Sequence, residues 1–148
     1  MPISSLKQLY ERNLDKLSAE ISNYEDEKDL WKIGTNINNS GGNLCLHLIG
    51  NLNTFIGATL GNFEYQRQRE LEFSLKDVPR AELLSKIEET KRVVLETLDL
   101  LAPETLQEEY PLQVFSQKTS IAYMLIHLTT HLTYHLGQIN YHRRLITS

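Results

Sequence analysis

The sequence feature that most constrains the fold is the segment 127–142, near the C-terminal end. Four of the protein's five histidines fall in it, and His127, His131 and His135 follow one another at four-residue spacing. On an α-helix, residues four apart are offset by about 40° and lie about 6 Å apart along the axis, so these imidazoles share one stripe, which His142 continues two turns later. A neighbouring apolar stripe indicates an amphipathic helix that covers a core. Its members are Ile121, Leu125, Leu128, Leu132, Leu136, Ile139 and Ile146.

Two imidazoles at this spacing can chelate one divalent metal ion. The remaining histidine, His47, favours this interpretation, because it lies in the apolar segment 44–52, where a polar ring costs free energy unless it finds a partner. A site of three histidines leaves a coordination position open, as catalytic metal ions require. The alternative is that the histidines are core and border groups that bind no metal.

Three segments resemble the DinB/YfiT-like metalloprotein superfamily. Residues 127–142, with Tyr-His-Leu-Gly-Gln-Ile at 134–139, are similar to its last helix, and residues 39–52 are similar to its second helix. Residues 65–73 resemble a subgroup whose members are described as metal-dependent hydrolases. The resemblance covers the chain from about Trp31 onward. It implies a DinB-like four-helix bundle, up-down-down-up, with a long crossover between its second and third helices.

The resemblance also implies the ligands and the cofactor. In the family, one histidine of the second helix and two of the last helix bind a metal ion, and they match His47, His131 and His135 here. The metal is most often zinc or nickel, so we expect one divalent ion as cofactor. The chemistry that the resemblance implies is hydrolysis or the transfer of a low-molecular-weight thiol.

Hydrophobic periodicity independently predicts an all-α fold of four amphipathic helices. They are expected from Ser4 or Ser5 to about residue 23, over about 40–60, over about 79–101, and from Ser116 or Thr119 almost to the C-terminus. Ser40 or Asn43 is a candidate cap for the second helix, and Gly61-Asn62 would end it. No segment alternates like a β-strand. We therefore predict a single domain over residues 1–148.

Composition and charge restrict the partners. Charged residues make up 23% of the chain, the formal net charge is −4, and no basic cluster is present, so we expect no nucleic-acid partner. No apolar run of about 18 residues and no signal-peptide pattern is visible, which predicts a cytoplasmic protein without a membrane partner. The single cysteine, Cys45, fits a reducing compartment. It is expected in the core, because two residues before His47 on a helix it points about 160° away.

Residues beside the predicted ligands are candidates to position them. Asn51, one helical turn after His47, could hydrogen-bond the free ring nitrogen of that histidine or a bound water. Gln138 could orient His135 or its neighbour Tyr134. His127 could be a proton shuttle, a partner of the ligands, or a core histidine.

Other residues are candidates to bind a small-molecule substrate. The charge-rich segment 63–79 could be a solvated face, or a crossover near the metal on which Arg67 and Arg69 hold a carboxylate or phosphate. Trp31 could be an ordinary core residue or pack over the mouth of the site. Tyr134 lies toward the polar side of its helix and could reach the mouth.

Three neutral histidines would leave a divalent ion doubly positive, so the ion could lower the pKa of a bound water or thiol. Between His131 and His135 the chain has Leu132, Thr133 and Tyr134 and no glutamate, so chemistry of the His-Glu-x-x-His metalloprotease kind is not expected. The sequence thus predicts a metal-dependent hydrolase or thiol transferase. A non-enzymatic alternative is a metal-stabilised bundle that acts in binding or forms a homodimer, since family members often pair through helices.

Overall fold

The computed structural model describes residues 2–146, which are helical for the most part and contain no β-strand; one isolated bridge joins Glu109 and Ser120. The predicted all-α class is confirmed. The α-helices are α1 (Ile3–Ser22), α2 (Gly41–Leu52), α3 (Thr59–Gly61), α4 (Arg69–Ser74), α5 (Arg80–Leu100) and α6 (Ile121–Ile146). Two short 3-10 helices, η1 (Glu27–Trp31) and η3 (Pro103–Gln107), and a π-helical segment, η2 (Asn53–Ala58), complete the elements.

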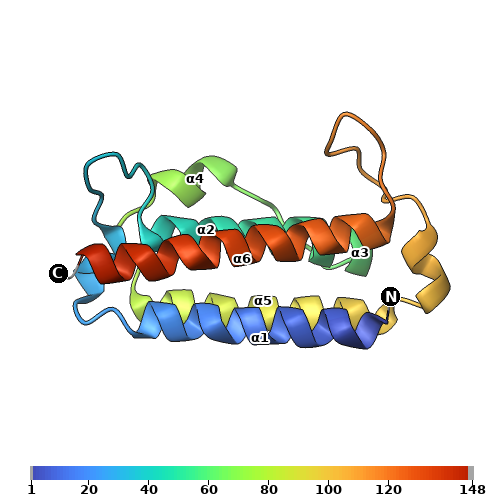
Figure 1. The fold of residues 1–148 in the computed structure, drawn as a ribbon, viewed down its shortest axis with the longest axis horizontal. Helices are drawn as coiled ribbons and strands as arrows, with labels where there is room; N and C mark the ends of the chain where they lie inside the picture. The colour runs from blue at the N-terminus through green and yellow to red at the C-terminus, as the bar shows by residue number, and fades with distance from the viewer. Residues whose placement is uncertain (1, 147–148) are drawn as a thin grey trace.

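The long helices lie side by side (Figure 1). α1 packs against α5 and α6, and α2 packs against α5 and α6. α1 and α6 run in one direction, whereas α2 and α5 run in the opposite direction. The connection between α3 and α5 therefore returns along the length of the molecule, and it carries α4 over α2. This crossover brings residues of the charge-rich segment next to the second helix.

Helix α1 shows how periodicity builds the core. Its buried side chains recur every three or four residues and face α5 and α6; they are Leu6, Tyr10, Leu14, Leu17 and Ile21. Burial of one such aliphatic side chain stabilises the fold by about 1.5–3 kcal/mol. The Tyr10 hydroxyl donates to the Leu125 carbonyl at 2.6 Å, which ties α1 to α6. The predicted serine cap of this helix is wrong, because α1 already begins at Ile3 and Pro2 occupies the cap position.

The predicted second helix is interrupted. Ser40 caps α2 as expected, since its hydroxyl accepts from the Asn43 backbone N–H at 3.2 Å. After Leu52, however, the chain forms the π-helical segment η2, at whose start the Asn53 side chain donates to the Ile49 carbonyl and to Thr90. The helix ends at Asn62 in the left-handed conformation, with φ of 56°. That end agrees with the Gly61-Asn62 prediction.

One segment of the described residues, Gly41–Gly61, is long and apolar enough by composition to cross a membrane, although the sequence analysis expects no span. In the structure, 67% of the apolar 18-residue stretch within this segment is buried inside the protein. A core helix of a folded domain has the same property, because it is surrounded by other helices rather than by lipid.

Helix α6 begins later than predicted. Its first residue is Ile121, and the Ser120 hydroxyl accepts from the Tyr123 backbone N–H at 3.0 Å. The preceding residues are held in an extended pairing, because the Tyr110 N–H donates to the Thr119 carbonyl at 2.8 Å and the Ile121 N–H donates to Glu108 at 2.9 Å. Backbone groups bonded in this way cannot start a helix at Ser116 or Thr119.

Candidate metal centre

The three predicted ligands come together where α2 packs against α6. The Nε2 atom of His131 lies 3.3 Å from Nε2 of His47 and 3.1 Å from Nε2 of His135. One ring nitrogen from each residue lies within 4.8 Å of the other two, so this group could hold a metal ion. His47 is buried, and the two histidines of α6 are half-buried.

Hydrogen bonds on the far side of two rings fix where their protons are. Nδ1 of His47 lies 3.1 Å from Oε1 of Glu72, and Nδ1 of His135 lies 2.7 Å from Oε1 of Gln138. A carboxylate or a carbonyl oxygen only accepts, so each Nδ1 carries the proton and donates it. The Nε2 atoms of His47 and His135 therefore direct lone pairs toward the centre of the group.

His131 cannot satisfy both of these lone pairs. A neutral imidazole carries one N–H, so His131 can donate to only one of the two neighbouring Nε2 atoms. Its Nδ1 is buried and has no hydrogen-bond partner in the described part of the chain. At least one of the Nε2 lone pairs therefore has no hydrogen-bond donor of its own. A metal ion at the centre would accept electron density from all three nitrogens, so the donor set fits a divalent metal.

Near neutral pH, a second proton on His47 or His131 does not supply the missing hydrogen-bond donor. Burial, and then the neighbouring rings of His135 and His47, lower the pKa of His131 to about 4. Burial also lowers the pKa of His47, although its hydrogen bond with Glu72 acts in the opposite direction. Both rings are therefore neutral at physiological pH, which is the state that binds metal ions.

Glu72 is the site residue that sequence reasoning missed. Its side chain is 6% exposed, and beside its contact with His47 it accepts from Nε of Arg67 at 2.8 Å and from Nη2 at 3.0 Å. The guanidinium thus compensates the buried carboxylate through a two-point ion pair. In the sequence, Glu72 lies in the charge-rich segment 63–79, whose pattern is equally consistent with a solvent-exposed surface.

Two features of the fold bring Glu72 to His47. The Asn43 side chain donates to the backbone carbonyls of Glu72 and Leu75, both at 2.9 Å, and so holds α4 against α2. Gly50 leaves the room that the carboxylate occupies, because a Cβ at this position would lie 1.8 Å from Oε2 of Glu72. A glycine one turn after a histidine in an apolar helix was the only signal in the sequence, and it does not identify the partner.

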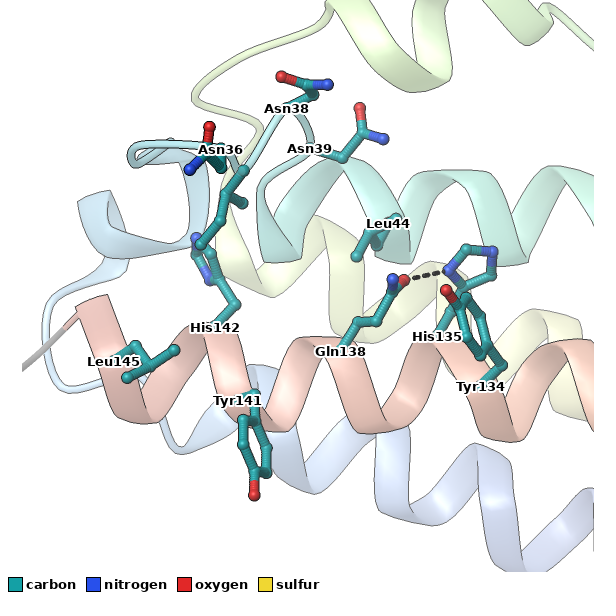
Figure 2. Close-up of a pocket in the computed structure, with 11 residues that line it drawn as sticks. Asn36, Asn38, Asn39, Leu44, Tyr134, His135, Gln138, Tyr141, His142 and Leu145 are labelled. Carbon is teal, nitrogen blue, oxygen red and sulfur yellow. Dashed lines mark hydrogen bonds between the residues drawn. The ribbon is translucent and has the colours of Figure 1, made fainter.

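The predicted positioning residues lie at different distances from the group. Gln138 contacts His135 as described (Figure 2). Asn51 is buried, but Glu72 rather than Asn51 meets Nδ1 of His47, and the Asn51 side-chain oxygen has no hydrogen-bond partner among residues 2–146. His127 lies one turn before the group, its ring 6.4 Å from the His131 ring and edge-to-face with Phe115 at 4.7 Å.

The predicted substrate-binding residues are also dispersed. Tyr134 is 64% exposed, and its ring lies 5.3 Å from that of His135. Trp31 is buried in the core, where its ring fills the space above Gly42: a Cβ there would lie 2.8 Å from it. Arg67 binds Glu72, and Arg69 is exposed at the start of α4. These placements bring Tyr134 and Arg67 to the site and leave Trp31 in the core.

Two further residues lie outside the group. His142, at the end of the histidine stripe, is buried between the Tyr24 hydroxyl, 2.7 Å from Nδ1, and the Lys32 carbonyl, 2.8 Å from Nε2. Cys45 is fully buried, and burial raises the pKa of its thiol to about 12. Its placement agrees with the core position expected from the sequence.

A cavity of about 450 Å³ reaches the histidine group at His135. It lies between the loop 36–39 and α6, and the side chains of Leu44, Tyr134 and Gln138 border it near His135 (Figure 2). At its other end it reaches His142 and Leu145. Of the three predicted ligands, His135 alone lines this cavity, on the side where its ring meets Gln138.

Comparison with known proteins places the chain in a family. No curated protein matches it. A sequence model described as "Protein of unknown function (DUF1572)" matches residues 2–148, which is almost the entire chain. The chain therefore belongs to DUF1572, a DinB-like family.

Proposed function

We propose that the chain is a metal-dependent enzyme in which His47, His131 and His135 bind one divalent ion and a small-molecule substrate reacts beside it. The observation that carries this proposal is the convergence of three Nε2 atoms while Glu72 and Gln138 hold the opposite nitrogens of two of the rings. Membership of DUF1572 and the helix directions in Figure 1 support a DinB-type four-helix bundle.

A divalent ion bound here would supply a Lewis acid that lowers the pKa of a water or thiol ligand. Imidazole donors suit zinc and nickel, which the family resemblance also favours. The chain's own contribution is to fix the donors. Glu72 accepts the Nδ1 proton of His47 in a hydrogen bond and makes Nε2 a better donor, and Arg67 binds the buried Glu72 carboxylate at two points.

An open coordination position supports catalysis rather than a purely structural role. Among residues 2–146, the potential metal-binding group contains three histidines and no fourth His, Cys, Asp or Glu. Structural zinc sites are usually closed by four protein ligands, whereas catalytic sites keep a position for water or substrate. A small molecule would approach along the cavity beside His135.

A second role has support from the surface of α6. The side chains of Tyr123, Tyr141 and Leu145 are more than half exposed on this helix. Such side chains favour the homodimer expected from the resemblance, and a metal-stabilised bundle that acts only in dimerisation is the non-catalytic alternative. Sedimentation of the wild type against Tyr141→Glu tests the dimer: the variant should sediment as a monomer, and a monomeric wild type refutes it.

Metal content tests the principal proposal. Protein purified without a histidine tag should contain about one zinc or nickel per chain, as one three-histidine site requires. His131→Ala should lose the metal, whereas His127→Ala, which removes the neighbouring histidine outside the group, should retain it. Stoichiometric metal in His131→Ala would refute the ligand assignment.

Two assays then separate the two reactions. Thiol transfer predicts metal-dependent conjugation of a thiol to an electrophile, and hydrolysis predicts turnover of an ester or amide without added thiol. Either activity should be lost in His135→Ala and retained in His127→Ala if His127 is not a proton shuttle. If the metal-bound protein shows no activity in either assay, the non-catalytic role is favoured.

A further inference from the structure

We propose that the cavity beside His135 selects substrates whose body is uncharged. This inference rests on the proposed function, since it assigns the class of substrate that reaches the same site. The substrate would present its reacting atom at the histidine group and place a neutral group, such as an amide or a hydroxyl-bearing chain, in the cavity.

The composition of the cavity wall carries the inference. Charged residues make up 23% of the chain, yet among residues 2–146 no Asp, Glu, Lys or Arg lines this cavity. The wall combines apolar side chains such as Leu44 and Leu145 with uncharged polar ones such as Gln138 and the asparagines of the loop 36–39. Figure 2 shows Gln138 and Leu44 between that loop and α6, next to His135.

A charged substrate body would lose hydration in this cavity without gaining a partner. A carboxylate or ammonium group that leaves water must find an opposite charge or several hydrogen bonds, and the described residues of the wall offer no opposite charge. A neutral amide or hydroxyl can exchange its hydrogen bonds with water for bonds to carboxamides, which both donate and accept.

The nearby arginines do not supply the missing charge. Nε and Nη2 of Arg67 both bind the Glu72 carboxylate, and Arg67 does not line the cavity. Arg69 is exposed on α4 and is also absent from the wall. The anion clamp expected from the sequence is therefore not formed on this side of the site.

The charge of a bound metal would act mainly on the reacting atom. The cavity extends along α6 from His135 to Leu145, which corresponds to about 15 Å at the helical rise of 1.5 Å per residue. A substrate group at the Leu145 end would lie too far from a metal ion at the histidines to form an ion pair with it. The side chains of the cavity wall, rather than the metal, therefore determine which substrate group fits there.

Three small thiols that differ in the charge of their body test the proposal: N-acetylcysteamine is neutral, mercaptopropionate is anionic and cysteamine is cationic. Each is titrated into metal-free and zinc-loaded protein while the NMR signals of the Gln138 side-chain amide and the Leu145 backbone amide are followed. We expect N-acetylcysteamine to shift these signals at a concentration at least roughly fivefold lower than the charged thiols, which corresponds to about 1 kcal/mol.

A charge variant supplies the matched control. Asn39→Lys adds a cation to the wall and should shift the preference toward mercaptopropionate. Thr130→Lys adds the same charge on the exposed surface of α6, outside the cavity, and should retain the preference for N-acetylcysteamine. An unchanged preference in Asn39→Lys would contradict the proposal.

The outcomes also separate this inference from the proposed function. Equal or tighter binding of a charged thiol at these signals, or no shift with any probe, overturns the neutral selectivity even if metal binds. Absence of metal from the protein overturns the proposed function, whereas the titrations of the metal-free protein still decide the selectivity of the cavity.

Discussion

Glu72 contacts Nδ1 of His47 through Oε1 at 3.1 Å, and both side chains are almost completely buried. The contact joins α4, which belongs to the crossover, to α2. A buried carboxylate requires a partner that compensates its charge, and Arg67 supplies it from the same crossover. The crossover is thus part of the candidate site, because it fixes the ring orientation and the proton of one predicted ligand.

Replacing Glu72 should weaken metal binding without unfolding the protein. Glu72→Gln keeps the shape of the side chain but removes the negative charge that makes His47 a stronger donor. We expect the metal affinity to fall by about 10- to 100-fold, the usual effect of losing such a partner. Competition with a chromophoric chelator measures the affinity. Glu70→Gln, an exposed change on the same short helix, should leave the affinity unchanged; equal affinities for both variants would contradict the role of Glu72.

Gly50→Ala should also weaken metal binding, through Glu72. The added Cβ would lie 1.8 Å from Oε2 and 2.7 Å from Cδ of Glu72, so the carboxylate must move away from His47. Metal affinity should therefore fall, as measured with the same chelator.

Gly137→Ala is the matched control for this change. No atom lies within 4 Å of a Cβ at Gly137, so the higher helix propensity of alanine should raise the free energy of unfolding by up to about 1 kcal/mol in urea denaturation. Its metal affinity should not change. If Gly50→Ala binds metal as tightly as Gly137→Ala, the space at Gly50 does not position Glu72.

The sequence predicted those parts of the site that depend on local periodicity. The spacing of His131 and His135 on one helix, and the placement of His47 on another, follow from the 3.6-residue repeat and are found in the structure. The helix boundaries at Ser40 and Asn62, which follow from the capping and turn preferences of nearby residues, also agree with the structure.

Features that depend on contacts distant in sequence were not predictable. Glu72 reaches His47 because Asn43 holds α4 in place and Gly50 leaves space, and neither contact has a local signature. The late start of α6 has the same origin, because the pairing of Tyr110 with Thr119 competes with the helix. The core position of Trp31 likewise depends on a distant residue, because Gly42 leaves the room that its ring fills.

The metal-free protein should lose stability as the pH falls, in part through His142. Burial lowers the pKa of His142 below its ordinary value, so the unfolded state binds a proton more readily than the folded state. The contribution to stability is present above the unfolded pKa of about 6.5 and is lost as the pH falls through the folded pKa.

The geometry explains which proton is unfavourable. Nε2 of His142 donates to the Lys32 carbonyl, so Nδ1 accepts from the Tyr24 hydroxyl. A further proton would be added at the buried Nδ1, and the Tyr24 hydroxyl would then have to turn its own proton toward the Ile139 carbonyl, 3.3 Å away. Urea denaturation of metal-free protein at several pH values measures the slope. His142→Gln should be less stable than the wild type near neutral pH and should show a smaller loss on acidification. A wild type whose stability is constant from neutral pH down to the folded pKa would rule out this account.

Removal of the metal should leave the helices intact. The apolar side chains of α6, including Leu128, Leu132 and Ile139, are buried in the hydrophobic core, so the packing of this helix does not require an ion. A chelator should therefore leave the far-ultraviolet circular dichroism signal unchanged. Added zinc should raise the melting temperature, because an ion that binds only the folded state at about 100 times its Kd stabilises it by about 2.7 kcal/mol. His131→Ala should show no such increase, whereas His127→Ala should. Loss of the helical signal in chelator would show instead that the metal is required for folding, as in a zinc finger.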